Sequence, residues 1–124
     1  RPDIPTSKIN DQMGSEEYFQ NAILRPILKL QNDLFVSVFR NYIKKHKNVF
    51  FDLTLEKKQH YIEQSIQKDI KFRNSLKGMV IGMFTVEEYE TYTLNSSALN
   101  KRMMNLLIVR LKDQMLLFEK IDAA

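Results

Sequence analysis

The 124-residue chain has no cysteine, only three glycines and three prolines, and two histidines. The absence of cysteine excludes a disulfide framework, a thiolate metal site and a catalytic cysteine. So few turn-forming residues predict long elements. No apolar run approaches the roughly 20 residues of a membrane span, and no signal-peptide pattern stands at the start. Because residue 1 is arginine rather than methionine, we expect a further N-terminal piece.

The composition is that of a soluble globular protein. Hydrophobic residues make up 44% and charged residues 27% of the chain, and the mean hydropathy is −0.37. The length fits one domain with one core. Residues 1–14 contain two prolines and a glycine without periodicity, which predicts an extended N-terminal arm. Residues 15–124 are predicted to form a single helical domain, located in the cytoplasm.

Positive charge is concentrated in the middle of the chain. The net charge is +4, and residues 40–77 hold ten basic and four acidic residues. Such a stretch could bind a polyanion, because Lys and Arg near phosphates release counterions. The alternative is a solvated helical face, which fits the lysine-rich, acid-interrupted composition better. A nucleic-acid partner is therefore the secondary interpretation.

Apolar residues at steps of three and four predict a first long helix that begins at Ser15. Pro26 lacks an amide hydrogen and crowds the preceding turn, so we expect a break or kink near residues 24–25. Lysines at 44, 45 and 47 suit the end of this helix. Asn48 is expected to be left-handed, and Phe50 and its neighbours are expected to close one end of the bundle.

A second long helix is predicted from Thr54 to Gly82, and a short helix from the capping box at Thr85 to about Thr93. A third long helix should run from Asn95 or Ser96 to about Lys120. No segment has the alternation of a strand. The predicted fold is all-α, an up-and-down bundle of three long helices and one short helix, with about three quarters of the residues helical.

The candidate site is centred on Asp69 and Arg73, two charges in the apolar seam of the second long helix. At a spacing of four residues the two side chains can pair along a helix. Partial burial would make the pair costly unless further polar groups satisfy it. The possible partners are Asn74, Asn100, Arg102 and Asn105. The alternatives are a structural cluster that sets helix register, a boundary salt bridge, and a ligand pocket.

Two further patterns could carry function. Gly78 and Gly82 have the spacing of a close helix-packing motif. His46 and His60 lack the paired Glu-x-x-His motifs of a di-iron bundle, so no metal or other cofactor is expected. Nor does any serine lie in a nucleophile motif, so no catalytic residue is assigned.

Several segments resemble a family of small bacterial proteins of unknown function. They are Leu24–Leu34, Ser65–Gly82, Phe84–Tyr89 and Asn95–Asn105, and the likeness covers most of residues 18–118. The resemblance implies no established activity or cofactor. Proteins of this kind sometimes carry a glyoxalase label, but the glyoxalase fold needs strand-rich repeats with His and Glu metal ligands, and this sequence has neither strand patterns nor enough histidines.

These observations favour a non-enzymatic interaction or assembly module that forms a homodimer. Three broad apolar helix faces carry more apolar surface than one monomer of this size can cover. The alternatives are a nucleic-acid-associated protein that uses residues 40–77, and a ligand-binding or enzymatic bundle with a polar site around Asp69 and Arg73.

Overall fold

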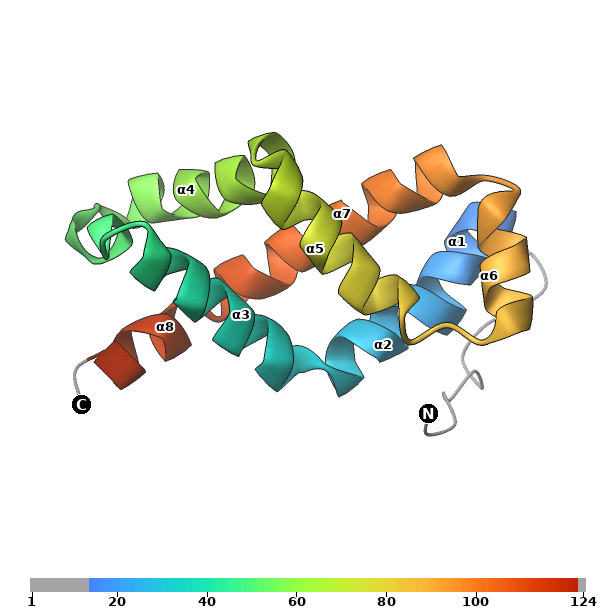
Figure 1. The fold of residues 1–124 in the computed structure, drawn as a ribbon, viewed down its shortest axis with the longest axis horizontal. Helices are drawn as coiled ribbons and strands as arrows, with labels where there is room; N and C mark the ends of the chain where they lie inside the picture. The colour runs from blue at the N-terminus through green and yellow to red at the C-terminus, as the bar shows by residue number, and fades with distance from the viewer. Residues whose placement is uncertain (1–13, 123–124) are drawn as a thin grey trace.

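The computed structural model describes residues 14–122 (Figure 1). Within this range 86% of the residues are helical and none lies in a strand, which confirms the all-α prediction. The elements are α1 (Ser15–Phe19), the π-helical turn η1 (Gln20–Leu24), α2 (Arg25–Leu30), α3 (Asn32–Lys45), the 3-10 turn η2 (Val49–Asp52), α4 (Leu55–Lys68), α5 (Ile70–Ile81), α6 (Val86–Thr93), α7 (Ser96–Asp113) and α8 (Met115–Asp122).

The chain passes along the long axis of the molecule three times, as α1–α3, α4–α5 and α7–α8, with α6 at one end (Figure 1). Each passage is divided: the first at Gln31, the second at Asp69 and the third at Gln114. The specific prediction, an up-and-down bundle of three long helices and one short helix, is therefore not confirmed, although the predicted segments themselves are helical.

The three divisions all lie at polar residues. Asp69 is extended, with φ −83° and ψ 97°, and caps α5. Gln31 (φ −99°, ψ 19°) and Gln114 (φ −116°, ψ 21°) also leave the helical region. At Asp69 and Gln114 the side chain bonds a nearby backbone group, the Phe72 amide and the Arg110 carbonyl, and so competes with the helix. At Gln31 the side chain instead bonds the Met83 sulfur.

Pro26 changes the first passage in an unexpected way. The π-helical turn Gln20–Leu24 directly precedes α2, whose first turn contains the proline. A π-helical turn shifts the backbone hydrogen bonds by one residue, which accommodates a missing amide hydrogen without ending the helix. The backbone irregularity is thus present before Pro26, but the helix ends only at Gln31.

The loop after α3 has the left-handed residue that the sequence predicts. Asn48 has φ 60°, and Lys47, which was not predicted, has φ 64°. This turn directs Phe50 into the core, where its side chain is fully buried against the rings of Phe39 and Tyr61. The expected closure of one end is confirmed for Phe50, whereas Val49 remains half exposed.

The predicted helix starts are mostly correct. The Thr54 hydroxyl accepts from the Lys57 amide, and Thr85 and Glu88 form the reciprocal capping box. The first helix begins at Ser15 as predicted, and its N-cap is Gly14. The arm expected for residues 1–14 lies, apart from Gly14, outside the described residues.

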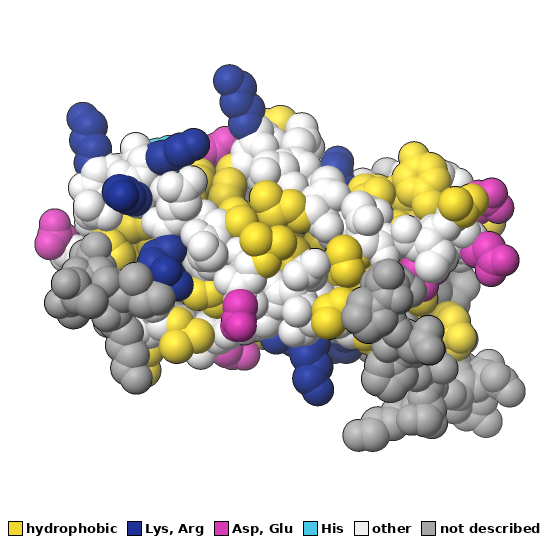
Figure 2. Space-filling model, turned by 60° about the horizontal axis from the view of Figure 1, so that its bottom comes forward, with side chains coloured by type: hydrophobic (Ala, Val, Ile, Leu, Met, Phe, Trp, Pro, Cys, Tyr) yellow, Lys and Arg dark blue, Asp and Glu magenta, His cyan; other side chains and the backbone are white. Residues whose placement is uncertain are grey.

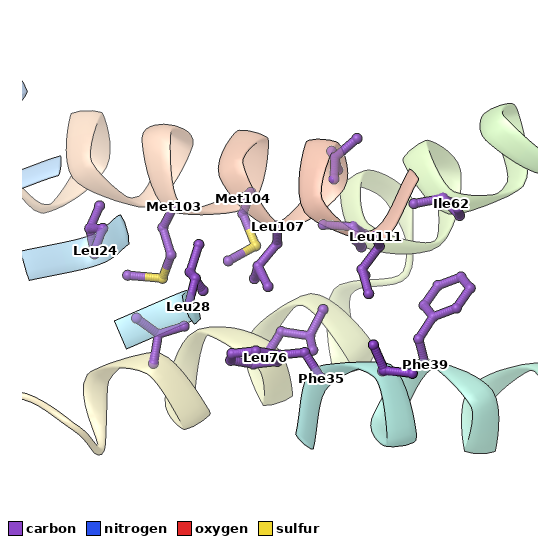
Figure 3. Packing of buried hydrophobic residues seen from close by; sticks show 14 of the residues in the cluster. Leu24, Leu28, Phe35, Phe39, Ile62, Leu76, Met103, Met104, Leu107 and Leu111 are labelled. Atoms are coloured by element: carbon purple, nitrogen blue, oxygen red, sulfur yellow. The ribbon is translucent and has the colours of Figure 1, made fainter. Parts of the chain in front are cut away.

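Helix α7 is the centre of the fold and packs against α1, η1, α4, α5 and α6. Figure 3 shows its buried side chains directed toward those of α2, α3 and α5. The labelled members of this core are Leu24, Leu28, Phe35, Phe39, Ile62, Leu76, Met103, Met104, Leu107 and Leu111. Burying each large apolar side chain contributes roughly 1.5–3 kcal/mol, so this core is the main favourable contribution to folding.

Candidate functional site

Asp69 lies between two helices rather than inside one. Its carboxylate accepts a hydrogen bond from the Phe72 amide at 3.2 Å and one from the Tyr42 hydroxyl at 2.9 Å. The first bond caps α5, and the second ties the α4–α5 corner to α3. The Phe72 amide, followed by the Tyr42 hydroxyl, lowers the pKa of Asp69 below its usual 3.8. The carboxylate is therefore ionised and acts as an acceptor that joins three helices.

Tyr42 is held between two other rings. The rings of His46 and Phe72 each lie with their centroids 4.1 Å from that of Tyr42. His46 Nδ1 is 2.8 Å from the Tyr42 carbonyl oxygen, one helical turn earlier. Burial, followed by the hydrogen bond to Asp69, raises the pKa of Tyr42 above its usual 10.0. The hydroxyl therefore stays protonated at ordinary pH and donates to Asp69, which links α3 to the α4–α5 corner.

The pairing predicted between Asp69 and Arg73 is not found among the ion pairs of residues 14–122. Arg73 lies one turn into α5, where its backbone amide bonds the Asp69 carbonyl and its side chain is partly buried. Asn74 is exposed on the same helix. The helix break at Asp69 changes the relative directions of the two side chains, so the seam expected from continuous periodicity does not form there.

The three candidates on α7 belong to separate contacts. Asn100 accepts a hydrogen bond from the Tyr92 hydroxyl and so fastens α6 to α7. Arg102 donates to Gln20 at 3.0 Å and to Glu16 at 3.5 Å, which ties α7 to α1 and η1. Asn105 is exposed at the rim of a nearby groove. The structure therefore does not bring the predicted polar cluster together at one site.

The glycine pair does not mediate close helix packing. A Cβ atom at Gly78 would meet nothing within 4 Å, and one at Gly82 would approach the Gly78 carbonyl oxygen at 3.2 Å. That contact is within a single helix, because Gly82 is the C-cap of α5. Within the described residues of the single chain, Gly78 and Gly82 therefore do not lie at a close contact between two helices.

One polar network was not predicted at all. The side-chain amides of Asn32 and Gln114 bond each other in both directions, at 2.6 and 2.7 Å. Arg110 donates to the same Asn32 oxygen at 3.1 Å. The network joins the break of the first passage to the break of the third. The sequence shows the amide residues but not their pairing, because the tertiary fold brings together residues that are 82 positions apart.

Two of the open grooves on the described surface include candidate or neighbouring residues. The first, of about 540 Å³, runs between α3 and α5. Its lining consists of Ser37, Val38, Asn41, Tyr42, Lys45, Phe72, Ser75 and Met79. The second, of about 580 Å³, lies between α1 and α7 and includes Arg102 and Asn105. The α3–α5 groove has four apolar or aromatic side chains and a flanking lysine, a composition that suits contact with a partly hydrophobic protein surface.

The described part of the chain contains no group of three His, Asp or Glu side chains placed to hold a metal ion. None of the helices within residues 14–122 combines the length and the apolar character of a membrane span. No protein-family model, curated protein or solved structure matches the chain. The function is therefore inferred from the residues and surfaces described above.

Proposed function

We propose that this protein is a non-enzymatic interaction or assembly module of the bacterial cytoplasm that forms a homodimer. The observation that supports the proposal is the apolar surface left over once the core is complete. Leu30 and Leu34 are 46% and 45% exposed on either side of the first helix break, and Val109 is 58% exposed on the central helix. Hydrophobic side chains gather over the middle of one face (Figure 2). Exposed apolar side chains that gather on one face are typical of a protein interface.

The polar residues considered as an active site already have structural partners. The Asp69 carboxylate receives two hydrogen bonds, and Arg102 donates to two residues of the first passage. These bonds fix the corners and the helix contacts of the fold. This arrangement favours the interaction module over the alternative of an enzymatic or ligand-binding bundle.

The nucleic-acid alternative fits the structure less well. The basic residues of segment 40–77 are divided between the corner that joins α3 to α4 and the separate helix α5. Asp52 and Glu56 are exposed within the first of these groups. A protein that binds along a duplex neutralises successive phosphates with neighbouring basic side chains. The separation of the two basic groups interrupts such a row.

The homodimer is tested by sedimentation velocity of the purified chain over a range of micromolar concentrations. We expect a species of twice the 14.7 kDa chain mass that dissociates on dilution. A species of 14.7 kDa at every accessible concentration would exclude the homodimer.

A further inference from the structure

The two ends of the molecule carry opposite charge. Residues 44–58, which join α3 to α4, hold five lysines against two acids, whereas residues 78–100 hold three glutamates and neither lysine nor arginine. We name the first group the basic end (Lys44, Lys45, Lys47, Lys57 and Lys58) and the second the acidic end (Glu87, Glu88 and Glu90 of α6). Figure 1 places the α3–α4 corner and α6 at opposite ends of the long axis.

One face presents both ends together with the apolar surface between them. In Figure 2, most Lys and Arg side chains lie toward one end, and the other end shows acidic but no basic side chains; hydrophobic side chains gather over the middle, where some acidic side chains also lie. The α3–α5 groove, with Val38, Phe72 and Met79 in its lining, supplies apolar side chains along the middle passages. Partly exposed Leu34 lies one turn before Val38 on α3.

We propose that this face binds a second copy of the chain, in an antiparallel arrangement about a two-fold axis through the middle of the face. Rotation by half a turn exchanges the two ends. The basic end of each copy then meets the acidic end of the other, and the apolar middle meets itself. A two-fold interface needs a surface that complements itself in this way. The assignment rests on the proposed homodimer and names its interface.

The charged contacts at the ends and the apolar contacts in the middle have different effects on the dimer. Exposed ion pairs contribute little affinity and are screened by salt, but they guide approach and reject wrong registers. Apolar side chains removed from water supply the affinity. We therefore expect the dimer to weaken with added salt without dissociating completely. A parallel arrangement would place like charges together at both ends.

The charge contacts are tested with two reversed variants, Lys44→Glu/Lys57→Glu and Glu87→Lys/Glu90→Lys. All four side chains are exposed, so both variants should fold, which circular dichroism checks. Each variant alone should sediment at 14.7 kDa under conditions where the natural chain is dimeric. An equimolar mixture should regain twice that mass, because the reversed ends complement each other and the unchanged ends still match.

The apolar middle is tested with Ser75→Arg, which places a charge at an exposed position of the α3–α5 groove. We expect a folded monomer. The control is Lys101→Glu at an exposed position of α7 that lines the α1–α7 groove instead of the α3–α5 groove, and it should remain dimeric.

The outcomes separate this interface from the homodimer itself. If the natural chain dimerises and both reversed variants and Ser75→Arg do so equally well, the homodimer stands and this interface is wrong. If the two reversed variants remain monomeric when mixed, the antiparallel arrangement is wrong. A natural chain that stays at 14.7 kDa, and binds duplex DNA only while Lys44 and Lys57 are present, would overturn both proposals in favour of a nucleic-acid partner.

Discussion

At the scale of single residues, the turn after α3 contains two consecutive left-handed positions, Lys47 and Asn48. Asparagine adopts this conformation readily, but a lysine there places its Cβ against the following carbonyl at a cost of roughly 1–2 kcal/mol. The cost is offset by the burial of Phe50, which this turn delivers into the core. The turn therefore stores local strain in exchange for closing one end of the molecule.

Replacing Lys47 with glycine should relieve this strain. We expect Lys47→Gly to stabilise the fold by about 0.5–1 kcal/mol, since glycine adopts positive φ freely but has a more flexible unfolded chain. The matched control is Lys44→Gly, in the last turn of α3, which should destabilise by a similar amount. Urea denaturation monitored by circular dichroism measures both. Equal destabilisation by the two variants would show that Lys47 is not strained.

Asp69 should give the fold a dependence on acid. Its pKa is lowered in the folded state, so its contribution is complete above the unfolded value of 3.8 and is lost as the pH falls through the lower folded value. Between about pH 5 and about pH 2, the natural chain should lose more stability than Asp69→Asn, which has no carboxylate at this position. Denaturation curves at several pH values measure this difference. If the natural chain and Asp69→Asn lose equal stability over this pH range, the pKa of Asp69 is not lowered in the folded state.

At the scale of elements, the sequence predicts where helices start better than where they are interrupted. The caps at Thr54 and Thr85 are local, because each involves residues three positions apart. The breaks at Asp69 and Gln114 combine a local bond with a distant one, since Asp69 also accepts from Tyr42, 27 residues away, and Gln114 also bonds Asn32, 82 residues away. A periodic pattern of apolar residues continues through such a break, since both halves still face the same core.

The break at Asp69 leads to a prediction about the α4–α5 corner. Asp69→Ala removes the cap of α5 and the acceptor of the Tyr42 hydroxyl, so it should cost about 1–2 kcal/mol. Asp69→Asn keeps a good capping side chain, so its loss of stability should be only a few tenths of the loss caused by Asp69→Ala. Chemical denaturation at neutral pH compares the two variants. Similar losses would mean that the charge matters more than the cap.

Arg73 supplies the corresponding test of the pairing expected from sequence. A buried ion pair that loses one partner costs about 3–5 kcal/mol. Because the Asp69 carboxylate is bound to Phe72 and Tyr42 instead, Arg73→Ala should cost less than about 1 kcal/mol. A loss of several kcal/mol in the same denaturation experiment would restore the predicted pair.

At the scale of the whole molecule, the candidate site shows how far sequence reasoning reaches. Asn100 and Arg102 were expected as partners of Asp69 and Arg73, whereas Asn100 bonds Tyr92 of α6 and Arg102 bonds Gln20 of η1. Their grouping with Asp69 was not correct, because it assumed an unbroken second helix. Because the second helix is broken at Asp69, the predicted residues lie in different parts of the fold. The surface with opposite charges at its ends becomes visible only when three passages of the chain are placed side by side.

The amide pair of Asn32 and Gln114 joins the first passage to the third, across 82 residues of sequence. Each single alanine variant leaves the other, partly buried amide without its partner and should cost about 1 kcal/mol.

The double variant removes both groups at once, so its cost should fall short of the sum of the single costs by at least about 0.5 kcal/mol. The control combines Asn32→Ala with Thr85→Ala, whose capping box lies on α6 and shares no partner with Asn32. That pair should be additive. Urea denaturation of all the variants gives the coupling energy. Additivity in both pairs would mean that the two helix breaks form independently, whereas coupling confined to Asn32 and Gln114 would establish that the bends of the first and third passages hold each other in place.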